Sequence, residues 1–209
     1  MALENVMPVT PILRHVHALK AEHISDSDIE SLRRSMLDGS LGPSGLTKHD
    51  ASEVLISAVC RSDAGRCSYT TKRMNVAPSN IIAEAWNPDR LVGFLRMDMD
   101  RFLRLLEKRP VPLQGFVLRN GSEIYSADTD GNHRTVAAKM RGMSNIPCEV
   151  EVFKDLVKGS YLVQYYNEPS HGHYFDSPVH TINVDDRVNK FVAARVIVAM
   201  GADEAIYYD

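Results

Sequence analysis

The chain has 209 residues, 44% of them hydrophobic, and a formal net charge of −3 at pH 7. This length suffices for one large domain or two small ones, and the apolar fraction is that of an ordinary globular protein. The slight excess of acid excludes a global positive field that would draw the chain to nucleic acid, although a local basic patch stays compatible with it. No signal-peptide pattern and no apolar run of about 18 residues is present, so we expect a cytoplasmic protein without a membrane partner.

The three cysteines, Cys60, Cys67 and Cys148, form no CxxC pair. This usage favours reduced thiols, with a Cys60–Cys67 disulfide as the alternative. Cys148 falls on the apolar side of an alternating segment, so we expect it to be a small buried hydrophobe.

The N-terminal third is predicted to be helical. Ser25–Asp28 is rich in helix-capping residues, and apolar residues follow it at helical spacing. After a break rich in glycine, Thr47 and Asp50 resemble a capping box that opens a second helix. The polar segment 61–72 is predicted to be a loop. The cations in it and directly after it could form a small basic patch: Arg61, Arg66, Lys72 and Arg73.

A helix followed by a hairpin is predicted after Asp98. Asp98 caps the helix, whose apolar residues recur at i, i+3, i+4 and i+7. Two strand-like runs, 114–119 and 122–127, flank Asn120-Gly121, the dipeptide that best tolerates positive φ at both turn positions. The turn is expected at a surface tip.

A second helix and a strand complete this region. The helix begins after Gly131 and ends at Gly142, which suits a left-handed C-cap. Residues 146–153 then alternate between apolar and acidic side chains, as in a half-buried strand.

Further along, the pattern predicts a strand near 161–166 and a last helix that Asp185 or Asp186 caps and Gly201 ends. Four side chains between them could bind zinc or a transition metal, with a plain polar loop as the alternative: His171, His173, Asp176 and His180.

The stretch Asp130–Thr135 lies between the hairpin and the second helix, where free backbone amides can hold a phosphate. Gly131 lets the backbone approach a ligand closely. Arg134 can place two donors on phosphate oxygens, and His133 can donate to another oxygen. Thr135 adds a hydroxyl in the first turn. The residue types therefore suit a polyphosphate cradle.

Acidic residues beside this cradle offer two further roles. Asp130 or Asp128 could bind Mg²⁺ next to the phosphates or act as a general base toward an acceptor hydroxyl. The structural alternative is that Asn132 caps the helix, Arg134 pairs with one of these aspartates, and His133 is a surface side chain.

The sequence Asp130-Gly131-Asn132-His133-Arg134 resembles the ParB/sulfiredoxin superfamily over roughly residues 97–153. The resemblance includes the hairpin with Tyr125, the small residues after the motif, Gly142, and the Ile146-Pro147 strand start. It implies an α+β fold with a small mixed sheet packed with helices over 76–156. A helical N-terminal extension (1–75) and a C-terminal extension with a helix (157–209) would pack around it.

The resemblance also implies function. Superfamily members include partition proteins that bind CTP and DNA, sulfiredoxins that use ATP, and free-serine kinases. It implies a nucleoside triphosphate, ATP or CTP, with Mg²⁺, bound by Gly131, Asn132, His133, Arg134 and Thr135. Asp130, Asp128 and His133 are the candidate catalytic residues, and Asp130 and Asp128 the candidate metal ligands.

Two functions follow. The first is a nucleotide-dependent phosphotransferase or NTPase whose acceptor is a small molecule or a nucleic acid. The alternative is a ParB-like DNA-binding module, one variant of which is nuclease-like. No helix-turn-helix pattern follows the core, however. Sulfiredoxin chemistry is excluded because Asn132 stands where those enzymes carry the catalytic cysteine, and an amide cannot form the thiol intermediate.

Overall fold

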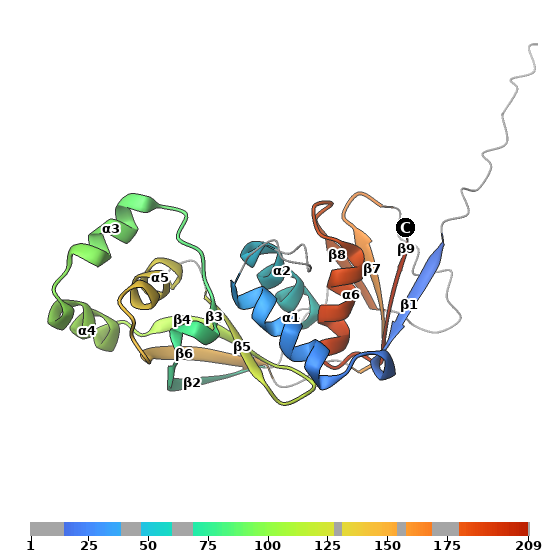
Figure 1. Ribbon diagram of the computed structural model, residues 1–209, viewed down its shortest axis with the longest axis horizontal. Helices are drawn as coiled ribbons and strands as arrows, with labels where there is room; N and C mark the ends of the chain where they lie inside the picture. The colour runs from blue at the N-terminus through green and yellow to red at the C-terminus, as the bar shows by residue number, and fades with distance from the viewer. Residues whose placement is uncertain are drawn as a thin grey trace, which may run out of the picture.

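The computed structural model describes residues 15–38, 47–59, 69–127, 131–153, 158–168 and 180–208. Within these ranges the chain is an α+β protein with six α-helices and two mixed β-sheets (Figure 1). No helix in the described ranges is long and apolar enough to cross a membrane.

The five-stranded sheet, here the central sheet, is built from the middle of the chain. Its strand order is β2 (Tyr69–Val76), β6 (Ile146–Phe153), β4 (Val111–Val117), β5 (Glu123–Ala127) and β3 (Ile81–Ile82). Three helices lie along one side of it (Figure 1): α3 (Pro88–Arg96), α4 (Met99–Lys108) and α5 (Asn132–Met140).

The four-stranded sheet, here the second sheet, joins the two ends of the described chain. Its order is β1 (Val16–Lys20), β9 (Glu204–Tyr208), β7 (Ser160–Tyr165) and β8 (His180–Val184). Beside it lie three helices: α1 (Asp26–Asp38), α2 (Lys48–Val59) and α6 (Lys190–Ala199). Short 3₁₀ turns, Ala21–His23 and Pro78–Asn80, precede α1 and β3.

The capping box predicted for α2 is confirmed. The Thr47 amide donates to Asp50 Oδ2 at 3.1 Å, and the Asp50 amide donates to Thr47 Oγ1 at 3.1 Å. Ser25 and Asp28 form the same reciprocal pair at the start of α1. These bonds satisfy amides that a helix start leaves without intrahelical partners.

The N-terminal third is not wholly helical, because it also contributes one strand to each sheet. β1 pairs antiparallel with β9. β2 pairs antiparallel with β6 from Tyr69↔Phe153 to Val76↔Ile146, so residues 69–72 of the expected loop lie on a strand instead, as does Arg73. The expected boundary at residue 75 falls inside β2.

The order helix, hairpin, helix, strand is confirmed by α4, β4–β5, α5 and β6. The hairpin turn differs from the expected one, because only Gly121 has a positive φ, +82°. The Gly121 amide donates to the Leu118 carbonyl at 2.8 Å, and the Leu118 amide donates to the Ser122 carbonyl at 2.8 Å. The loop therefore has three residues, a type I turn followed by a glycine bulge.

The helix ends are set by local hydrogen bonds. Gly142, at φ +65°, follows α5, and the Met143 amide donates back to the Ala138 carbonyl at 3.1 Å, as expected for a left-handed C-cap. The cap of α6 was predicted wrongly. Asn189 accepts from the Phe191 and Val192 amides, whereas Asp185 bonds to Arg187.

Two apolar clusters hold the layers together. One lies between the central sheet and α3–α5 and includes Phe102, Leu106 and Ile146. The other packs α1, α2, α6 and the second sheet against the opposite face of the central sheet, where Phe116 and Phe153 stack at 5.5 Å. The C-terminal segment thus packs on the central sheet, and it anchors the hairpin tip through the Arg119 amide and the Ala199 carbonyl, 2.7 Å apart.

Candidate functional site

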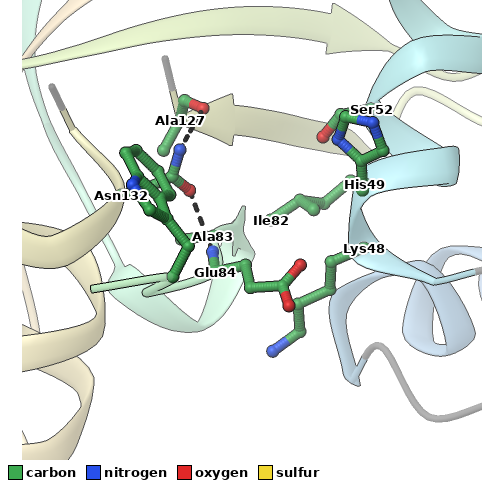
Figure 2. A pocket seen from close by; sticks show the side chains of 9 residues that line it. Lys48, His49, Ser52, Ile82, Ala83, Glu84, Ala127 and Asn132 are labelled. Atoms are coloured by element: carbon green, nitrogen blue, oxygen red, sulfur yellow. Dashed lines mark hydrogen bonds between the residues drawn. The ribbon is translucent and has the colours of Figure 1, made fainter. Parts of the chain in front are cut away.

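A pocket of about 380 Å³ lies between α2 and the start of α5 (Figure 2). We call it the α2–α5 pocket. Its walls come from α2, from the end of β3 and the segment after it, from the end of β5 and from the first residue of α5. The lining residues are Lys48, His49, Ser52, Ile82, Ala83, Glu84, Trp86, Ala127 and Asn132.

The Asn132 side chain, on α5, forms hydrogen bonds to two other walls of the pocket. Its Oδ1 accepts from the Glu84 amide at 2.9 Å, and its Nδ2 donates to the Ala127 carbonyl at 3.2 Å (Figure 2). Asn132 is the first helical residue of α5, and Gly131, without a side chain, occupies the cap position. The side chain of Asn132 therefore positions the pocket wall and does not cap the helix.

His133 lies beneath the pocket wall and not on the surface. Its side chain is buried, its Nε2 accepts from the Asn87 amide at 3.0 Å, and the Trp86 ring meets it edge-on at 4.4 Å. Burial, assisted by the nearby charge of Arg90, lowers the pKa of His133. The imidazole is therefore neutral with its proton on Nδ1, an atom that has no hydrogen-bond partner among the described residues.

Arg134 turns toward the C-terminal end of α4. The residue is 8% exposed, and its Nη1 donates to the Arg109 carbonyl and, at 3.4 Å, to the Pro110 carbonyl. The Thr135 hydroxyl is also buried and has no hydrogen-bond partner. In this arrangement both side chains lie inside the fold, where α5 packs against the connection from α4 to β4. The phosphate contacts expected of them stay predictions.

Two oppositely charged side chains do reach the α2–α5 pocket. Lys48, the first residue of α2, is partly exposed, and Glu84 is exposed; neither side chain forms a hydrogen bond or ion pair within the described ranges. Figure 2 shows the Glu84 side chain extending toward that of Lys48. Trp86, the only tryptophan of the chain, is 55% exposed at the same pocket.

A second lysine lies close to Lys48. Lys139 on α5 donates from Nζ to the Ile81 carbonyl at 2.7 Å. Burial, together with the nearby charge of Lys48, lowers the pKa of Lys139 to about 8. Lys139 does not itself line the pocket, but its positive charge lies close enough to that of Lys48 for the two to repel each other.

The other polar groups of the pocket already have partners. Ser52 Oγ lies 2.7 Å from Ser126 Oγ on β5, and His49 Nε2 lies 3.5 Å from Glu53 Oε1 one helical turn away. Lys48 and Glu84 are thus the side chains that a ligand could engage without breaking an existing contact.

Several predicted site residues lie outside the described ranges. These are Asp128, Asp130, His171, His173 and Asp176, together with Cys60, Cys67, Arg61 and Arg66. Among the described residues no group of three or more His, Cys, Asp or Glu side chains could hold a metal ion. Cys148 is free and buried as expected, and burial raises its pKa to about 12.

Sequence patterns did not reveal Lys48, Glu84 or Trp86 as site residues. Lys48 stands in a helix start far from the motif, and only the packing of α2 beside α5 brings it there. Trp86 is the chain's single tryptophan, and this is the sequence signal that could have pointed to it. The structure adds that more than half of its surface is exposed. No protein-family model and no curated protein matches the chain.

Proposed function

We propose that the chain binds a nucleoside triphosphate in the α2–α5 pocket and transfers its terminal phosphoryl group. The observation that carries this proposal is one pocket that combines three features: a lysine without a hydrogen bond or ion pair to any described residue, an exposed tryptophan and the first residue of α5. An anionic phosphate is favoured at a helix N-terminus, and an exposed indole offers a face for a base.

Lys48 is the cation proposed for the phosphates. Arg134 was expected in this role, but its guanidinium donates to carbonyl oxygens and is 8% exposed. Lys48 has no such commitment within the described ranges and can meet a phosphate as a point charge. His133 and Asn132 would then act by fixing the backbone around the phosphate site.

Asp130 and Asp128 are proposed as the acidic groups of the reaction. Asp128 directly follows Ala127, which lines the pocket, and Asp130 directly precedes Gly131, the cap of α5. Mg²⁺, held by these carboxylates, would screen the phosphate charge. In the transfer the acceptor oxygen bonds to the terminal phosphorus while the bond to the bridging oxygen breaks, and a carboxylate takes the acceptor proton.

The resemblance to the ParB/sulfiredoxin superfamily supports the same proposal. In that region β4 pairs antiparallel with β5 and parallel with β6, and α5 connects β5 to β6. This is a small mixed sheet packed with helices, the architecture that the resemblance implies.

The alternative, a DNA-binding module, has less support. Lys72 and Arg73 are exposed on the edge strand β2, but neighbouring residues of a strand point to opposite faces. Arg73 also lies opposite Glu149 on β6. The two cations therefore do not form one basic surface.

The proposal is tested by screening ATP, CTP, GTP and ADP by thermal shift, with and without Mg²⁺, followed by calorimetry. We expect one triphosphate to raise the melting temperature, and Lys48→Ala to weaken its binding by about ten- to a hundredfold, the effect of losing a charge-assisted contact. Lys108→Ala, an exposed lysine in the last turn of α4, is the matched control.

Two further outcomes decide the reaction. Asp130→Asn should abolish phosphate release or transfer while nucleotide binding persists, because it removes the charge and basicity but keeps the shape. Turnover within about twofold of wild type would reject the catalytic role of Asp130. If duplex DNA stabilises the protein and no nucleotide does, the DNA-binding alternative replaces the proposal.

A further inference from the structure

We propose that the outer edge of β2 (Tyr69–Val76) is a docking site at which an extended acidic segment of another protein adds a strand to the central sheet. None of the residues that carry this proposal lines the α2–α5 pocket. It therefore stands or falls separately from the proposed function.

β2 offers a long backbone edge for pairing. It is the outermost strand of the central sheet, and all eight of its residues pair with β6 on the inner side. In an antiparallel pair about half of the N–H and C=O groups point away from the partner strand. Apart from β6, no described residue forms a hydrogen bond with the backbone of β2. Such a row of donors and acceptors is a template for another strand.

The edge carries a cation on each face of the sheet. Lys72 and Arg73 lie in the middle of β2, both are exposed, and neither forms an ion pair with any described residue. Neighbouring residues of a strand point to opposite faces, so the two charges are divided between the faces. Arg73 lies between the outer edge and Glu149 of β6, so the charge nearest to an added strand is positive on that face too.

This division matches the geometry of an added strand. Consecutive residues of the partner also alternate between the two faces. Two adjacent acidic residues at its centre would therefore meet one cation each, Lys72 on one face and Arg73 on the other. The pattern of charges on β2 thus specifies the chemistry of the partner.

A trough on the lysine face suits an apolar side chain of the partner. It has a volume of about 260 Å³ and extends from β2 across the sheet to β5. Met74, Val117 and Val152 line it, together with Gly115, which has no side chain to fill it. At the far end the Glu123 carboxylate already accepts a hydrogen bond from a tyrosine hydroxyl. A partner residue two positions from the acidic one points to the same face and can enter this trough.

The same charges argue against a second copy of this chain as the occupant. Antiparallel pairing of two β2 strands, centred on the strand, places Lys72 opposite Lys72, Arg73 opposite Arg73, or each opposite the other. Like charges directly opposite each other destabilise a pair of strands. Cations on an edge strand protect it from self-association but do not repel an acidic segment. The occupant that this edge favours is therefore an acidic segment of another protein.

Labelled synthetic peptides of eight residues, the length of β2, test the proposal by fluorescence anisotropy. The acidic peptide has two adjacent glutamates at its centre, a leucine two residues outside each of them, and threonine elsewhere. The basic peptide has lysines in place of the glutamates. We expect the acidic peptide to bind at least about tenfold more tightly, because two exposed ion pairs replace two repulsive contacts.

Charge reversal on the edge should reverse this preference. The double variant Lys72→Glu/Arg73→Glu should bind the basic peptide more tightly than the acidic one, again by about tenfold. The double variant Arg104→Glu/Lys108→Glu changes two exposed cations of α4 and is the matched control, so it should keep the wild-type preference. Circular dichroism checks that each variant is folded.

N-methylation of alternate amides in the acidic peptide tests the strand pairing itself. An added strand bonds to β2 along only one of its own two edges. Methylation of one alternate set of amides should therefore abolish binding, and methylation of the other set should not. Amide exchange measured by mass spectrometry should slow in Tyr69–Val76 when the unmethylated peptide binds.

The outcomes that overturn the proposal are distinct. They include failure of the acidic peptide to bind, equal affinity for the two peptides, and an unchanged preference in the variant reversed at β2. Binding that survives both patterns of methylation would be an ionic contact without strand pairing, and it also overturns the proposal. If light scattering shows a dimer that protects β2 without any peptide, the occupant is a second copy and the proposal is wrong. None of these results bears on nucleotide binding.

Discussion

Arg134 illustrates how burial changes the consequence of losing a single side chain. Its guanidinium donates to the carbonyls of Arg109 and Pro110 at the end of α4. Arg134 is only 8% exposed, so removing its side chain leaves those carbonyl oxygens without these donors in a largely buried place. We therefore expect Arg134→Ala to lower the free energy of unfolding by about 1.5–3 kcal/mol, measured by urea denaturation.

Arg134→Lys is the informative companion. It keeps the charge and one donor direction, so it should recover part of the lost stability. If Arg134→Ala unfolds at the wild-type urea concentration and loses nucleotide affinity, the guanidinium contacts phosphate and the structural role is wrong.

His133 gives the protein a pH-dependent stability. Burial lowers its pKa in the folded state from the ordinary value of 6.5, so the unfolded chain takes up a proton more readily than the folded one. Stability from this residue is complete above about pH 6.5 and is lost as the pH falls toward the folded pKa. The free energy of unfolding, measured between pH 7 and pH 5, should fall less steeply in His133→Asn than in the wild type.

At the scale of elements, α2 connects stability to binding. Its capping box fixes the first turn, and Lys48 is the first residue of that turn. Thr47→Ala should lower the free energy of unfolding by about 1 kcal/mol. It should also weaken nucleotide binding, because the helix start carries the lysine proposed to meet the phosphates. Ser25→Ala removes the matching bond at α1 and should lower stability alone. Equal affinity in both variants would show that the cap of α2 does not position Lys48.

Elements with local signals could be predicted, and elements with distant partners could not. Thr47 and Asp50, the hairpin around Gly121 and the cap at Gly142 each depend on residues a few positions apart. β2 is an edge strand with mostly exposed side chains, and its pairing partner β6 lies far along the chain. It therefore lacks the apolar alternation from which strands are read. The pocket escaped prediction for the same reason, because four separate segments line it.

At the scale of the whole molecule, the pocket joins two layers that have separate apolar clusters. α2 belongs to the apolar cluster that includes the second sheet. α5 belongs to the cluster between the central sheet and α3–α5. A ligand that contacts Lys48 and Asn132 should therefore slow amide hydrogen exchange in both α2 and α5. Exchange measured by mass spectrometry with and without nucleotide checks this, with β1 as the unaffected reference. Protection confined to α5 would show that α2 takes no part in binding.

The pairing of β1 with β9 has a consequence for synthesis in the cell. Lys48 is made early, but α2 packs against α6 and β8, and β1 has its partner only when residues 204–208 have been translated. The segments that form the central sheet all leave the ribosome before then. A nascent chain can thus assemble its central sheet first, while the α2 wall of the pocket waits for β8 and α6. The complete pocket would then form only once these two later elements have been translated.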